Sequence, residues 1–580
     1  MTRAEWTNLE PVIPISYGST EIVETGKWGY QKPEDVTFTA PCQEACPAGN
    51  PIARFLYQAT QKRYEDALLS LLRENPFPGT CGRVCFHPCE RDCNRSHFDE
   101  PVSVNALERY VFDVTSRLSP RLDPIDHPNP QPVAVVGGGP CGLSAAYFLT
   151  LLGHRVTLFE ATKDLGGMMR WGIPDYRLPK GVLRKEITRI LALGIEVQRG
   201  VRVGKETSFR ELENFKAVFL SPGAGLSRSL SLGEAKIHGI WKGLDFLQQI
   251  HSGDKVRLGK EIVVLGGGNT ALDAARTARR LGSRVVVIYR RTKAEMPAFE
   301  EEIQEAEEEG IGFEFLLQPV KMELVGRRRI RLTFQRMKLG RRDQTGRRRA
   351  IPVEGSFVTR EADGVVVAVG EDIDGSWIPP DLMEKGAIGV DAYLRTNRMP
   401  FFAGGDAVDQ PRTVVTAIAA GKRGALSIDL YLRGLSPETV FPRIAVGRKG
   451  ALSLEAYRVG IETGRFPERG EVVLHDRLHS LFFQPSKRIA PRRRRGEDAL
   501  RGFREVRLGL SRKEAEVSAQ RCLSCGTCNY CLNCYFFCPE GVIALDPVGE
   551  MKRVDLVHCK GCGTCAQSCP RSAIRMRENV

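Results

Sequence analysis

Runs of apolar, β-branched residues that end in glycine-rich turns dominate the middle of the chain. Residues 133–136 read VAVV and lead into a glycine-rich turn, a helical pattern and a second apolar run that ends at Glu160. The same order begins again at Glu261, and further apolar runs follow at 365–370 and 401–403. Strands of a parallel sheet are buried on both faces and read as continuous apolar runs. The pattern therefore predicts two α/β units, each built on a parallel sheet.

The segments around these units give weaker patterns. Residues 53–72 predict a helical stretch, and residues 296–315 predict a charged amphipathic helix with a solvated outer face. Residues 1–40 combine turn-forming proline and glycine and predict an irregular extension. Residues 436–515 mix proline, glycine and arginine and predict a strap with one closing helix.

Composition bounds the class of protein. A chain of 580 residues has room for three or four domains. No apolar run approaches the roughly 18 to 20 residues of a membrane span, and the polar N-terminus lacks the pattern of a signal peptide. The chain has 17 cysteines and no secretory signal, which is typical of a reduced compartment, so we expect a cytoplasmic protein.

The net charge of +14 raises the question of a nucleic-acid partner. The arginine runs at 327–329, 347–349 and 492–495 are scattered, however, and lack interleaved aromatic residues. We interpret them as solvated faces and linkers, with a docking surface for an acidic redox partner as the alternative. No nucleic-acid partner is expected.

Ten of the cysteines lie between Arg521 and Pro570. Eight of them form two copies of the spacing C-x2-C-x2-C-x3-C-P, in which the fourth cysteine ligates the cluster of the other copy. Zinc sites also use C-x2-C pairs, but they rarely chain three such steps and repeat them. The expected ligand sets are Cys528, Cys531, Cys534 with Cys569, and Cys559, Cys562, Cys565 with Cys538. The segment resembles a two-[4Fe–4S] ferredoxin.

Six further cysteines lie near the N-terminus and are spaced so that successive thiolates fall on neighbouring turns, which suits cluster ligation, with zinc as the alternative. They are Cys42, Cys46, Cys81, Cys85, Cys89 and Cys93. Here the chain resembles the small subunit of glutamate synthase and the N-terminal domain of dihydropyrimidine dehydrogenase, from about Gly26 to about Gly434. In those relatives an N-terminal cysteine series binds two [4Fe–4S] clusters.

The resemblance implies that Cys42 and Cys93 share one cluster with an upstream C-x2-C pair. That pair is missing here, because no cysteine precedes Cys42. Cys522 and Cys525 have the look of the missing pair, displaced to the other end of the chain. If they ligate, four [4Fe–4S] clusters are expected; if they do not, three are expected.

The resemblance groups Cys46, Cys85 and Cys89 in the other N-terminal cluster. In relatives the fourth ligand of this cluster can be a side chain that is not cysteine, near the position of Glu108. Cys81 competes with Glu108 for that role.

A dinucleotide fingerprint, Gly137-x-Gly139-x-x-Gly142, follows the first apolar run. The glycines permit a tight turn and close approach to a pyrophosphate, the helix N-terminus favours the anion, and Glu160 can bind a ribose hydroxyl. The segment LGGMMRWGIPDYRLPK, which contains Gly167, resembles the Gly-Gly segment of flavin disulfide reductase-like folds. This fingerprint is therefore the expected FAD site.

A second fingerprint is Gly266-x-Gly268-x-x-Ala271, and the strand after it ends in Arg290-Arg291 rather than in an acid. Basic residues at that point suit the 2′-phosphate of NADP. The pair can also serve structure or partner docking, which leaves NAD as the alternative.

Later segments complete the resemblance to a flavin fold. PGAG at 222–225 and VVVAVG at 365–370 resemble the crossover strands between FAD and nucleotide domains, and FFAGGDAV at 401–408 resembles the returning FAD strand. In that strand Asp406 would accept a hydrogen bond from the flavin ribityl chain, and the helix after Thr413 would point its N-terminus at the flavin. Otherwise, an aspartate in a glycine-rich turn is only a cap.

The sequence thus predicts a multidomain α/β protein with a helical Fe–S domain, two Rossmann-like domains of the flavin disulfide reductase type and a ferredoxin-like α+β domain. The expected boundaries are an N-terminal extension (1–40), the helical Fe–S domain (41–125), the FAD domain in two parts (126–245 and 376–435), the NAD(P)-binding domain (246–375), a linker or strap (436–515) and the ferredoxin domain (516–580).

No nucleophile–base set or paired-carboxylate site is evident, and hydride transfer to a flavin needs neither. A flavin exchanges a two-electron hydride for single electrons, and an iron–sulfur cluster carries one electron. The expected function is an NAD(P)H:acceptor oxidoreductase of the ferredoxin type, as one subunit of a complex. The resemblance suggests ferredoxin, or 2-oxoacid or aldehyde oxidoreductase subunits, as partners. The alternatives are a glutamate synthase small subunit and a non-catalytic electron-wiring subunit.

Overall fold

The computed structural model describes residues 24–35, 38–118, 120–232, 237–326, 329–343, 346–467, 470–546 and 551–578. The chain divides into two compact units. The large unit holds Pro41–Arg469 and Ser486–Cys522, and the small unit holds Met1–Ala40, Gly470–Pro485 and Leu523–Val580. Residues 1–23 of the expected extension lie outside the described residues. No helix in the described ranges is both long and apolar enough to cross a membrane.

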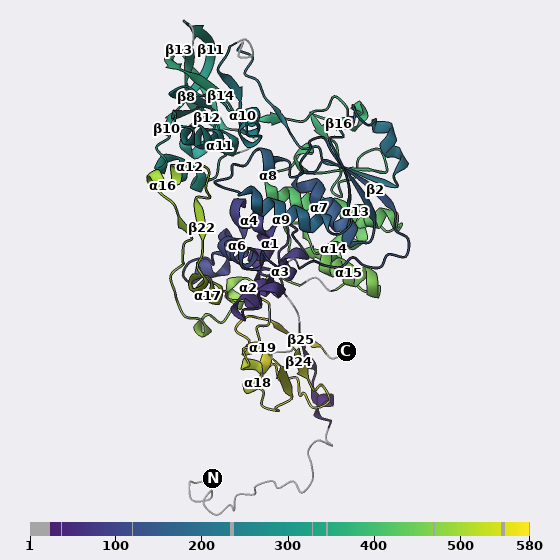
Figure 1. Ribbon diagram of the computed structural model, residues 1–580. Helices are drawn as coiled ribbons and strands as arrows, with labels where there is room; N and C mark the ends of the chain where they lie inside the picture. The colour runs from purple at the N-terminus through teal and green to yellow at the C-terminus, as the bar shows by residue number, and fades with distance from the viewer. Residues whose placement is uncertain are drawn as a thin grey trace, which may run out of the picture. The chain divides into compact units, whose positions relative to one another are not determined.

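The first sheet of the large unit is parallel, in the order β18-β5-β2-β3-β4. Its strands are β2 (Pro132–Val136), β3 (Arg155–Glu160), β4 (Glu196–Arg199), β5 (Ala217–Leu220) and β18 (Phe401–Ala403). The accompanying helices are α7 (Pro140–Leu151), α8 (Met168–Trp171), α9 (Lys180–Leu191) and α13 (Val414–Leu432). Helices α7 and α13 pack side by side (Figure 1), and α7 is buried almost all round, as expected for a helix that is apolar on every face.

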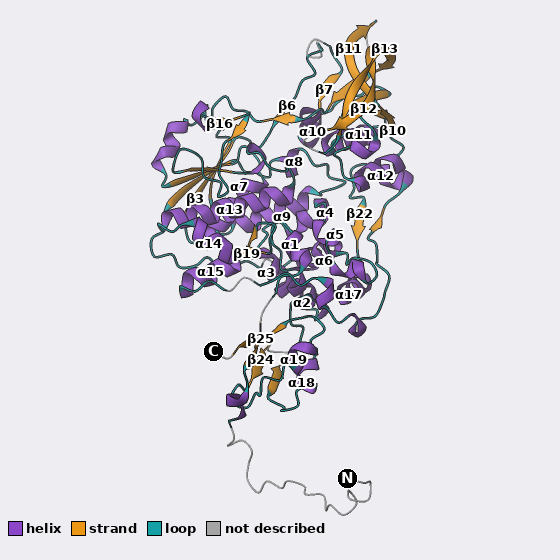
Figure 2. Cartoon of the chain, turned by 180° about the vertical axis from the view of Figure 1, so that it is seen from behind, coloured by secondary structure: helices purple, strands orange, loops and turns teal. Residues whose placement is uncertain are grey.

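The second sheet is also parallel, in the order β10-β9-β8-β14-β7. Its strands are β7 (Ile240–Lys242), β8 (Glu261–Leu265), β9 (Arg284–Tyr289), β10 (Gly312–Phe315) and β14 (Gly364–Val367), with helices α10 (Gly243–His251), α11 (Asn269–Arg280) and α12 (Glu300–Glu308). An antiparallel sheet, β11 (Leu317–Val325), β12 (Arg329–Arg342) and β13 (Arg348–Ala362), is inserted before β14 (Figure 2).

The two sheets are connected by two chain segments that pair with each other. The segment β6 (Leu226–Ser227) leaves the first sheet, and β15 (Glu371–Asp372) returns from the second. They pair antiparallel, Glu371 opposite Ser227. A β-hairpin, β16 (Met383–Glu384) and β17 (Ala387–Ile388), follows on the way to β18.

Short helices form the N-terminal part of the large unit: α1 (Pro41–Ala45), α2 (Ile52–Thr60), α3 (Tyr64–Leu72), α4 (Pro78–Val84), α5 (Pro88–Arg91) and α6 (Val104–Thr115). Phe55, Leu71 and Phe77 are fully buried among them. The predicted helical stretch at 53–72 is interrupted, because Lys62 has a φ of +59° and the helix cannot continue through a left-handed residue.

The segment from 436 onward contains more structure than the single helix expected. It forms α14 (Pro437–Ile444), α15 (Leu454–Thr463), α16 (Gly496–Leu500), α17 (Arg512–Gln520) and the short strands β19 (Ala445–Val446), β20 (Ala451–Leu452), β21 (Arg492–Arg493) and β22 (Arg507–Gly509). Side-chain caps support two of these helices, since Ser453 Oγ and Ser511 Oγ accept backbone N–H groups of the first turn. We call residues 486–522 the strap.

The small unit is built around α18 (Asn533–Phe536), α19 (Thr564–Gln567) and the hairpin β23 (Ile543–Asp546) and β24 (Met551–Val554). Its strand β25 (Ile574–Glu578) pairs antiparallel with β1 (Gln31–Asp35). Residues 31–35 were predicted to be irregular, and that prediction is wrong. Their sequence, QKPED, has no apolar alternation, so the strand is held by its backbone pairing with β25 and gives no sequence pattern.

Candidate functional site

The first fingerprint forms a tight turn between β2 and α7 that only glycine can adopt. Gly137 has a φ of +104°, and a Cβ there would lie 2.2 Å from the carbonyl oxygen of Ser221. A Cβ on Gly142 would lie 1.8 Å from the carbonyl oxygen of Gly137. Opposite the turn, a Cβ on Gly167 would lie 2.7 Å from Cα of Gly139. The glycines therefore keep two backbone segments close together at the N-terminus of α7.

Glu160 closes this turn from the end of β3. Its Oε2 accepts a hydrogen bond from the N–H of Gly138 at 2.7 Å, and its Oε1 accepts from the N–H of Thr162 at 2.7 Å. The side chain is buried and lines the cavity beside the fingerprint. The carboxylate is thus fixed where a ribose would meet it.

A cavity of about 320 Å³, which we call the fingerprint cavity, runs past Gly137–Gly139, Glu160, Gly167, Trp171 and Asp406. The indole Nε1 of Trp171 is buried and has no hydrogen-bond partner among the described residues. A buried donor without a partner is rare in native proteins. The glycine turn, the fixed carboxylate and this unpartnered donor fit a dinucleotide-binding cavity.

Asp406 lies at the other side of the fingerprint cavity, in the turn after β18. Burial raises the pKa of this carboxyl to about 6, and the Arg412 guanidinium acts against that rise. The next helix, α13, starts beside it with a capping box in which Thr413 Oγ accepts the N–H of Thr416. The helix predicted after Thr413 therefore presents its N-terminus to a second, adjoining cavity of about 180 Å³, which Asp406, Thr413 and Val414 line.

The second fingerprint repeats the first turn between β8 and α11. Gly266 has a φ of +143°, and a Cβ there would lie 2.1 Å from the carbonyl oxygen of Ala368. Gly268 is the N-cap of α11, and Ala271 is fully buried in its first turn. The N-terminus of α11 is thus available to an anion.

The two arginines after β9 lie in different environments. Arg290 is exposed, whereas Arg291 is buried and its Nη2 donates to Oδ2 of Asp343 at 2.9 Å, at the far end of β12. Of these two arginines, Arg290 is the one for which no carboxylate partner is observed among the described residues.

The second cavity of about 180 Å³, which we call the junction cavity, joins three parts of the large unit. It shares Pro140, Met168, Ala224, Asp406 and Ala417 with the fingerprint cavity. Asn269 and Thr270 of the second fingerprint line it, and so does Val84, the residue before Cys85. The two nucleotide turns and the N-terminal cysteine loops therefore meet at one place.

In the small unit the structure brings together Cys528, Cys531, Cys534 and Cys569, which line one small cavity. Burial raises the pKa of the Cys534 thiol to about 12, and the neighbouring Cys528 and Cys569 raise it further. The N–H of Tyr530 points at the sulfur of Cys528, at 3.4 Å. Because cluster assembly displaces thiol protons, such a group of adjacent thiols fits a cluster and not a set of isolated side chains.

The second predicted set of the small unit is also assembled. Burial raises the pKa of the Cys565 thiol, and the neighbouring Cys559, Cys562 and Cys538 raise it further. Cys562 is exposed, and its hydrogen bonding with the side chain and backbone of Thr564 lowers its pKa.

In the large unit Cys46, Cys85 and Cys89 lie together. Burial raises the pKa of the Cys46 thiol to about 11. Burial also raises the pKa of the Cys89 thiol well above its usual range, and the neighbouring Cys46 and Cys85 raise it further. Both candidates for a fourth ligand are present. Cys81 is buried beside Cys85, and Glu108 is a neighbour of Cys46 and Cys85.

Glu108 is fully enclosed between two amides. Its Oε1 accepts from Nδ2 of Asn50 at 3.0 Å and from Nδ2 of Asn75 at 3.2 Å. Burial raises the pKa of this carboxyl to about 8.

Three further cysteines of the large unit, Cys42, Cys93 and Cys522, are half-buried against its main hydrophobic core. The strap carries Cys522 there. Arg521 donates to the carbonyl oxygen of Pro101 at 3.0 Å. Burial raises the pKa of the Cys93 thiol, and the Arg521 guanidinium acts against that rise. Cys525 belongs to the small unit.

The large unit also contains a buried network of ion pairs that the sequence pattern did not predict. Arg276 on α11 is fully buried and donates to Glu302, Glu305 and Glu309, at distances of 2.6 to 3.1 Å. The solvated face predicted for the 296–315 segment is therefore wrong for these glutamates. Their spacing of three and four residues matches one helix face, but the partners come from α11 and the strap, which the local pattern does not contain.

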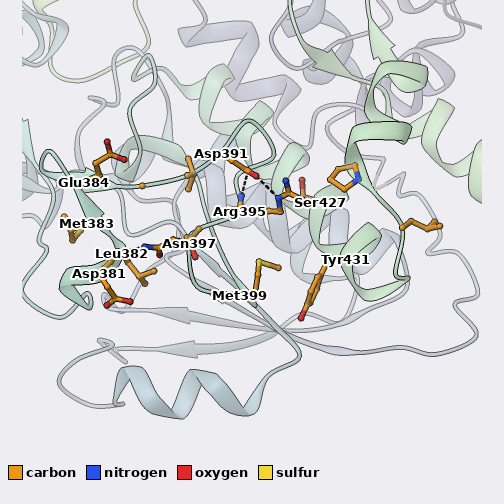
Figure 3. A pocket seen from close by; sticks show the side chains of 15 residues that line it. Asp381, Leu382, Met383, Glu384, Asp391, Arg395, Asn397, Met399, Ser427 and Tyr431 are labelled. Carbon is orange, nitrogen blue, oxygen red and sulfur yellow. Dashed lines mark hydrogen bonds and ion pairs between the residues drawn. The ribbon is translucent and has the colours of Figure 1, made fainter.

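Two other features do not belong to this site. A pocket of about 670 Å³ is lined by Asp381–Glu384, Asp391, Arg395 and Tyr431 (Figure 3), and none of its residues is a predicted ligand. The described residues also hold one compact His–Asp group, His127, His154 and Asp429. Backbone N–H groups donate to Nδ1 of both rings, so the neutral rings carry protons on Nε2, facing Asp429, where a metal would need a lone pair.

Comparisons with known families agree with this geometry. The model of the pyridine nucleotide-disulphide oxidoreductases matches residues 131–421. The model of dihydropyrimidine dehydrogenase domain II, a 4Fe-4S cluster domain, matches residues 37–119, and that of the 4Fe-4S dicluster domain matches residues 527–574. The predicted fold class is confirmed.

Individual relatives show the same combination. The NADP(+)-dependent formate dehydrogenase subunit beta of Moorella thermoacetica is 36% identical over 519 residues, which cover 84% of this chain and 70% of that protein. The NADPH-Fe(3+) oxidoreductase subunit beta of Geobacter sulfurreducens is 38% identical, over 70% of this chain and 66% of that protein. The NADPH glutamate synthase small chain of Escherichia coli K12 is 33% identical, over 66% of this chain and 87% of that protein.

These matches confirm the resemblance seen in the sequence, and with it FAD, NAD(P) and several [4Fe–4S] clusters as the cofactors. The chain belongs to the pyridine nucleotide-disulphide oxidoreductase family, as an NAD(P)H oxidoreductase that also carries iron–sulfur clusters.

Proposed function

We propose that the chain is the pyridine-nucleotide subunit of a cytoplasmic redox complex. In this role it passes electrons between NAD(P)(H) and a partner through FAD and a series of [4Fe–4S] clusters. The junction cavity carries the proposal, because the first fingerprint, the second fingerprint and the residue before Cys85 line the same space. A shared cavity is what hydride transfer followed by electron transfer requires.

The side chains have distinct tasks in this scheme. The turn at Gly137–Gly142 and the N-terminus of α7 would hold the pyrophosphate of FAD, Glu160 would hold its ribose, and Asp406 would accept from its ribityl chain. Bound flavin would supply the exchange between a two-electron hydride and single electrons. Met168, Ala224 and Leu244 line the junction cavity with apolar groups that exclude water.

The overall reaction balances as NAD(P)H plus two oxidised one-electron acceptors giving NAD(P)+, a proton and two reduced acceptors. The second fingerprint, with Gly266, Gly268 and Ala271, would hold the pyridine nucleotide, and its residues Asn269 and Thr270 line the junction cavity. The cluster of Cys46, Cys85 and Cys89 is nearest, with Val84 between it and the cavity. The eight small-unit cysteines from Cys528 to Cys569 form the exit, and the reverse direction uses the same groups.

For the number of clusters we propose four, with Cys522 and Cys525 completing the set of Cys42 and Cys93. The support is the position of Cys522, which the strap holds at the same core as Cys42 and Cys93. Anaerobically purified protein then contains about 16 iron atoms per chain, whereas about 12 would favour three clusters.

The partner is proposed from the relatives. Two of them are named as beta subunits, one of a formate dehydrogenase and one of an NADPH-Fe(3+) oxidoreductase. Their names add formate dehydrogenase to the 2-oxoacid and aldehyde oxidoreductases as a class of partner. The glutamate synthase small chain is less well supported, because its match leaves a third of this chain unaccounted for.

The test is anaerobic reduction of a viologen dye by the isolated holoprotein with NADPH or NADH. Turnover supports the proposal, and no turnover with either nucleotide would support a wiring subunit instead. Arg290→Ala is expected to raise the KM for NADPH about tenfold and leave NADH unchanged, since a guanidinium–phosphate contact is lost. Arg284→Ala, an exposed arginine at the start of the same strand, is the matched control. Equal effects on both nucleotides would contradict NADP as the preferred substrate.

A further inference from the structure

An aromatic stack joins the N-terminal cysteine loop to the nucleotide-binding part of the large unit. The rings of Phe86 and Phe299 lie with centroids 5.7 Å apart and planes 17° from parallel. Both side chains are half-buried. Phe86 stands between Cys85 and Cys89, and Phe299 stands just before α12.

The cysteine loop holds Phe86 in a fixed place. His87, the next residue, has a φ of +48°, a left-handed conformation that is costly for a residue with a Cβ. In this turn the backbone of His87 lowers the pKa of the Cys85 thiol, against the rise that burial causes. Pro88 then starts α5, whose second residue is Cys89. The loop conformation that gathers Cys85 and Cys89 therefore also sets the position of the Phe86 ring.

Phe299 is fixed in turn to the second fingerprint and lines the junction cavity. Its N–H donates to Oδ1 of Asn269 at 3.1 Å, and the N–H of Ala298 donates to the carbonyl oxygen of Gly267 at 3.2 Å. Asn269 is the first residue of α11. A displacement of Phe299 would thus move the turn that holds the nucleotide.

The rest of α12 is anchored separately. Arg507 of the strap donates to Glu305 at 2.8 Å and to Glu302 at 3.3 Å, and its carbonyl oxygen accepts from Arg109 of α6 at 2.7 Å. The strap thus fastens the middle of α12 to the N-terminal helices. The Phe86–Phe299 stack is the contact at the end of α12 that faces the junction cavity.

We propose that Phe86 is a positioning residue for hydride transfer: through Phe299 it sets the second fingerprint at the distance from the flavin that the reaction needs. The proposal rests on the function proposed above. Hydride transfer requires the reacting atoms about 3 to 3.5 Å apart, and a misplacement of about 1 Å costs on the order of 100-fold in rate. Nucleotide affinity depends on other contacts, so Phe86 acts on the rate of the hydride step and not on binding.

The experiment is anaerobic stopped-flow reduction of the bound flavin by NADPH in the holoprotein. Phe86→Ala and Phe299→Ala are each expected to slow flavin reduction by about 10- to 100-fold with little change in the concentration dependence. The double variant should be no slower than either single variant, because the two rings act as one contact. Phe86→Tyr should restore the rate. Phe313→Leu is the control, since Phe313 also stacks in this domain, on Phe315, but does not line the cavity.

A second readout does not depend on turnover. Hydrogen exchange of residues 296–308 should increase in Phe86→Ala, while β23 and β24 keep the exchange of the parent protein. Phe299→Ala lies outside the cysteine loop and tests the same contact if Phe86→Ala disturbs a cluster. Wild-type rates in both alanine variants would overturn the inference. Failure of the parent protein to be reduced by either nucleotide would overturn the proposed function as well.

Discussion

The two cysteine-rich regions differ in what surrounds their sulfurs. In the large unit the N-terminal cysteines sit at the edge of an extensive apolar core that contains Phe55, Leu71 and Phe77. In the small unit, the core cluster around the ferredoxin cysteines comprises Cys534, Ile543, Cys565 and Ile574, so two of its four buried members are predicted cluster ligands. One region packs its cysteines against a protein core, and in the other the cysteines make up much of the core.

Exposure follows the same division. Cys46, Cys81 and Cys89 are buried, whereas Cys531 and Cys562 are exposed. Burial excludes solvent from a site that exchanges electrons inside the protein, and exposure brings a cluster to a surface that a partner can reach. The comparison supports an internal relay at the N-terminal cysteines and an exit in the small unit.

Removal of iron is expected to have the largest effect, and that effect should differ between the two units. Because predicted cluster ligands form half of the buried group that holds β23 and β25, we expect this part of the small unit to lose its fold without clusters, since cluster binding supplies folding free energy. Hydrogen exchange should show protection lost at β23, β24 and α19 but kept at α7 and α13. Persistent protection of β23 and β24 in the iron-free protein would mean that the small unit folds by apolar packing alone.

The next largest effect is expected in the pH dependence of the large unit's stability, through Glu186 on α9. Its carboxylate oxygens accept from the N–H of Gly79 at 2.6 Å and of Thr80 at 3.1 Å, which docks α9 on the first turn of α4. Burial raises the pKa of Glu186 from 4.5 to about 7. A raised pKa favours the folded state below pH 4.5, and this contribution is lost as the pH rises through about 7.

The size of this effect is about 3 kcal/mol, since each pKa unit corresponds to about 1.4 kcal/mol. Urea unfolding of the large unit between pH 5 and pH 8 measures it. Glu186→Gln should flatten the profile, and an unchanged slope in that variant would assign the pH dependence to another group. Glu206→Gln, at an exposed carboxyl of the same domain, is the control.

The smallest effect concerns the strap. Arg521→Ala removes buried hydrogen bonds to Pro101 and Glu100, at 3.0 and 2.8 Å, and should destabilise the large unit by about 1 to 3 kcal/mol. Arg504→Ala breaks an exposed ion pair with Asp498 in the same segment and should cost less than about 1 kcal/mol. Thermal unfolding of the two variants compares them, and equal losses would show that the strap is not held at Arg521.

The sequence allowed the fingerprints and the ferredoxin ligand sets to be predicted because each depends on short, regular spacings that lie within one segment of the chain. Gly137, Glu160 and the fourfold set around Cys534 lie where local pattern places them. The contacts of Arg276 with Glu302, the pairing of β1 with β25 and the stack of Phe86 on Phe299 join distant segments. The sequence around one residue of such a pair does not indicate its partner, so these contacts could not be predicted without the structure.

The pairing of β1 with β25 has a consequence for the order in which the protein is made. Gln31 meets Glu578, so the first described strand must wait for nearly the whole chain before its partner is synthesised. The intervening segment contributes as well, since the N–H of Val473 donates to the carbonyl oxygen of Thr39 at 3.0 Å. The large unit can therefore fold during translation before the small unit is completed, since the small unit needs β25. A fragment cut at the cysteine motif alone would lack both of these earlier segments.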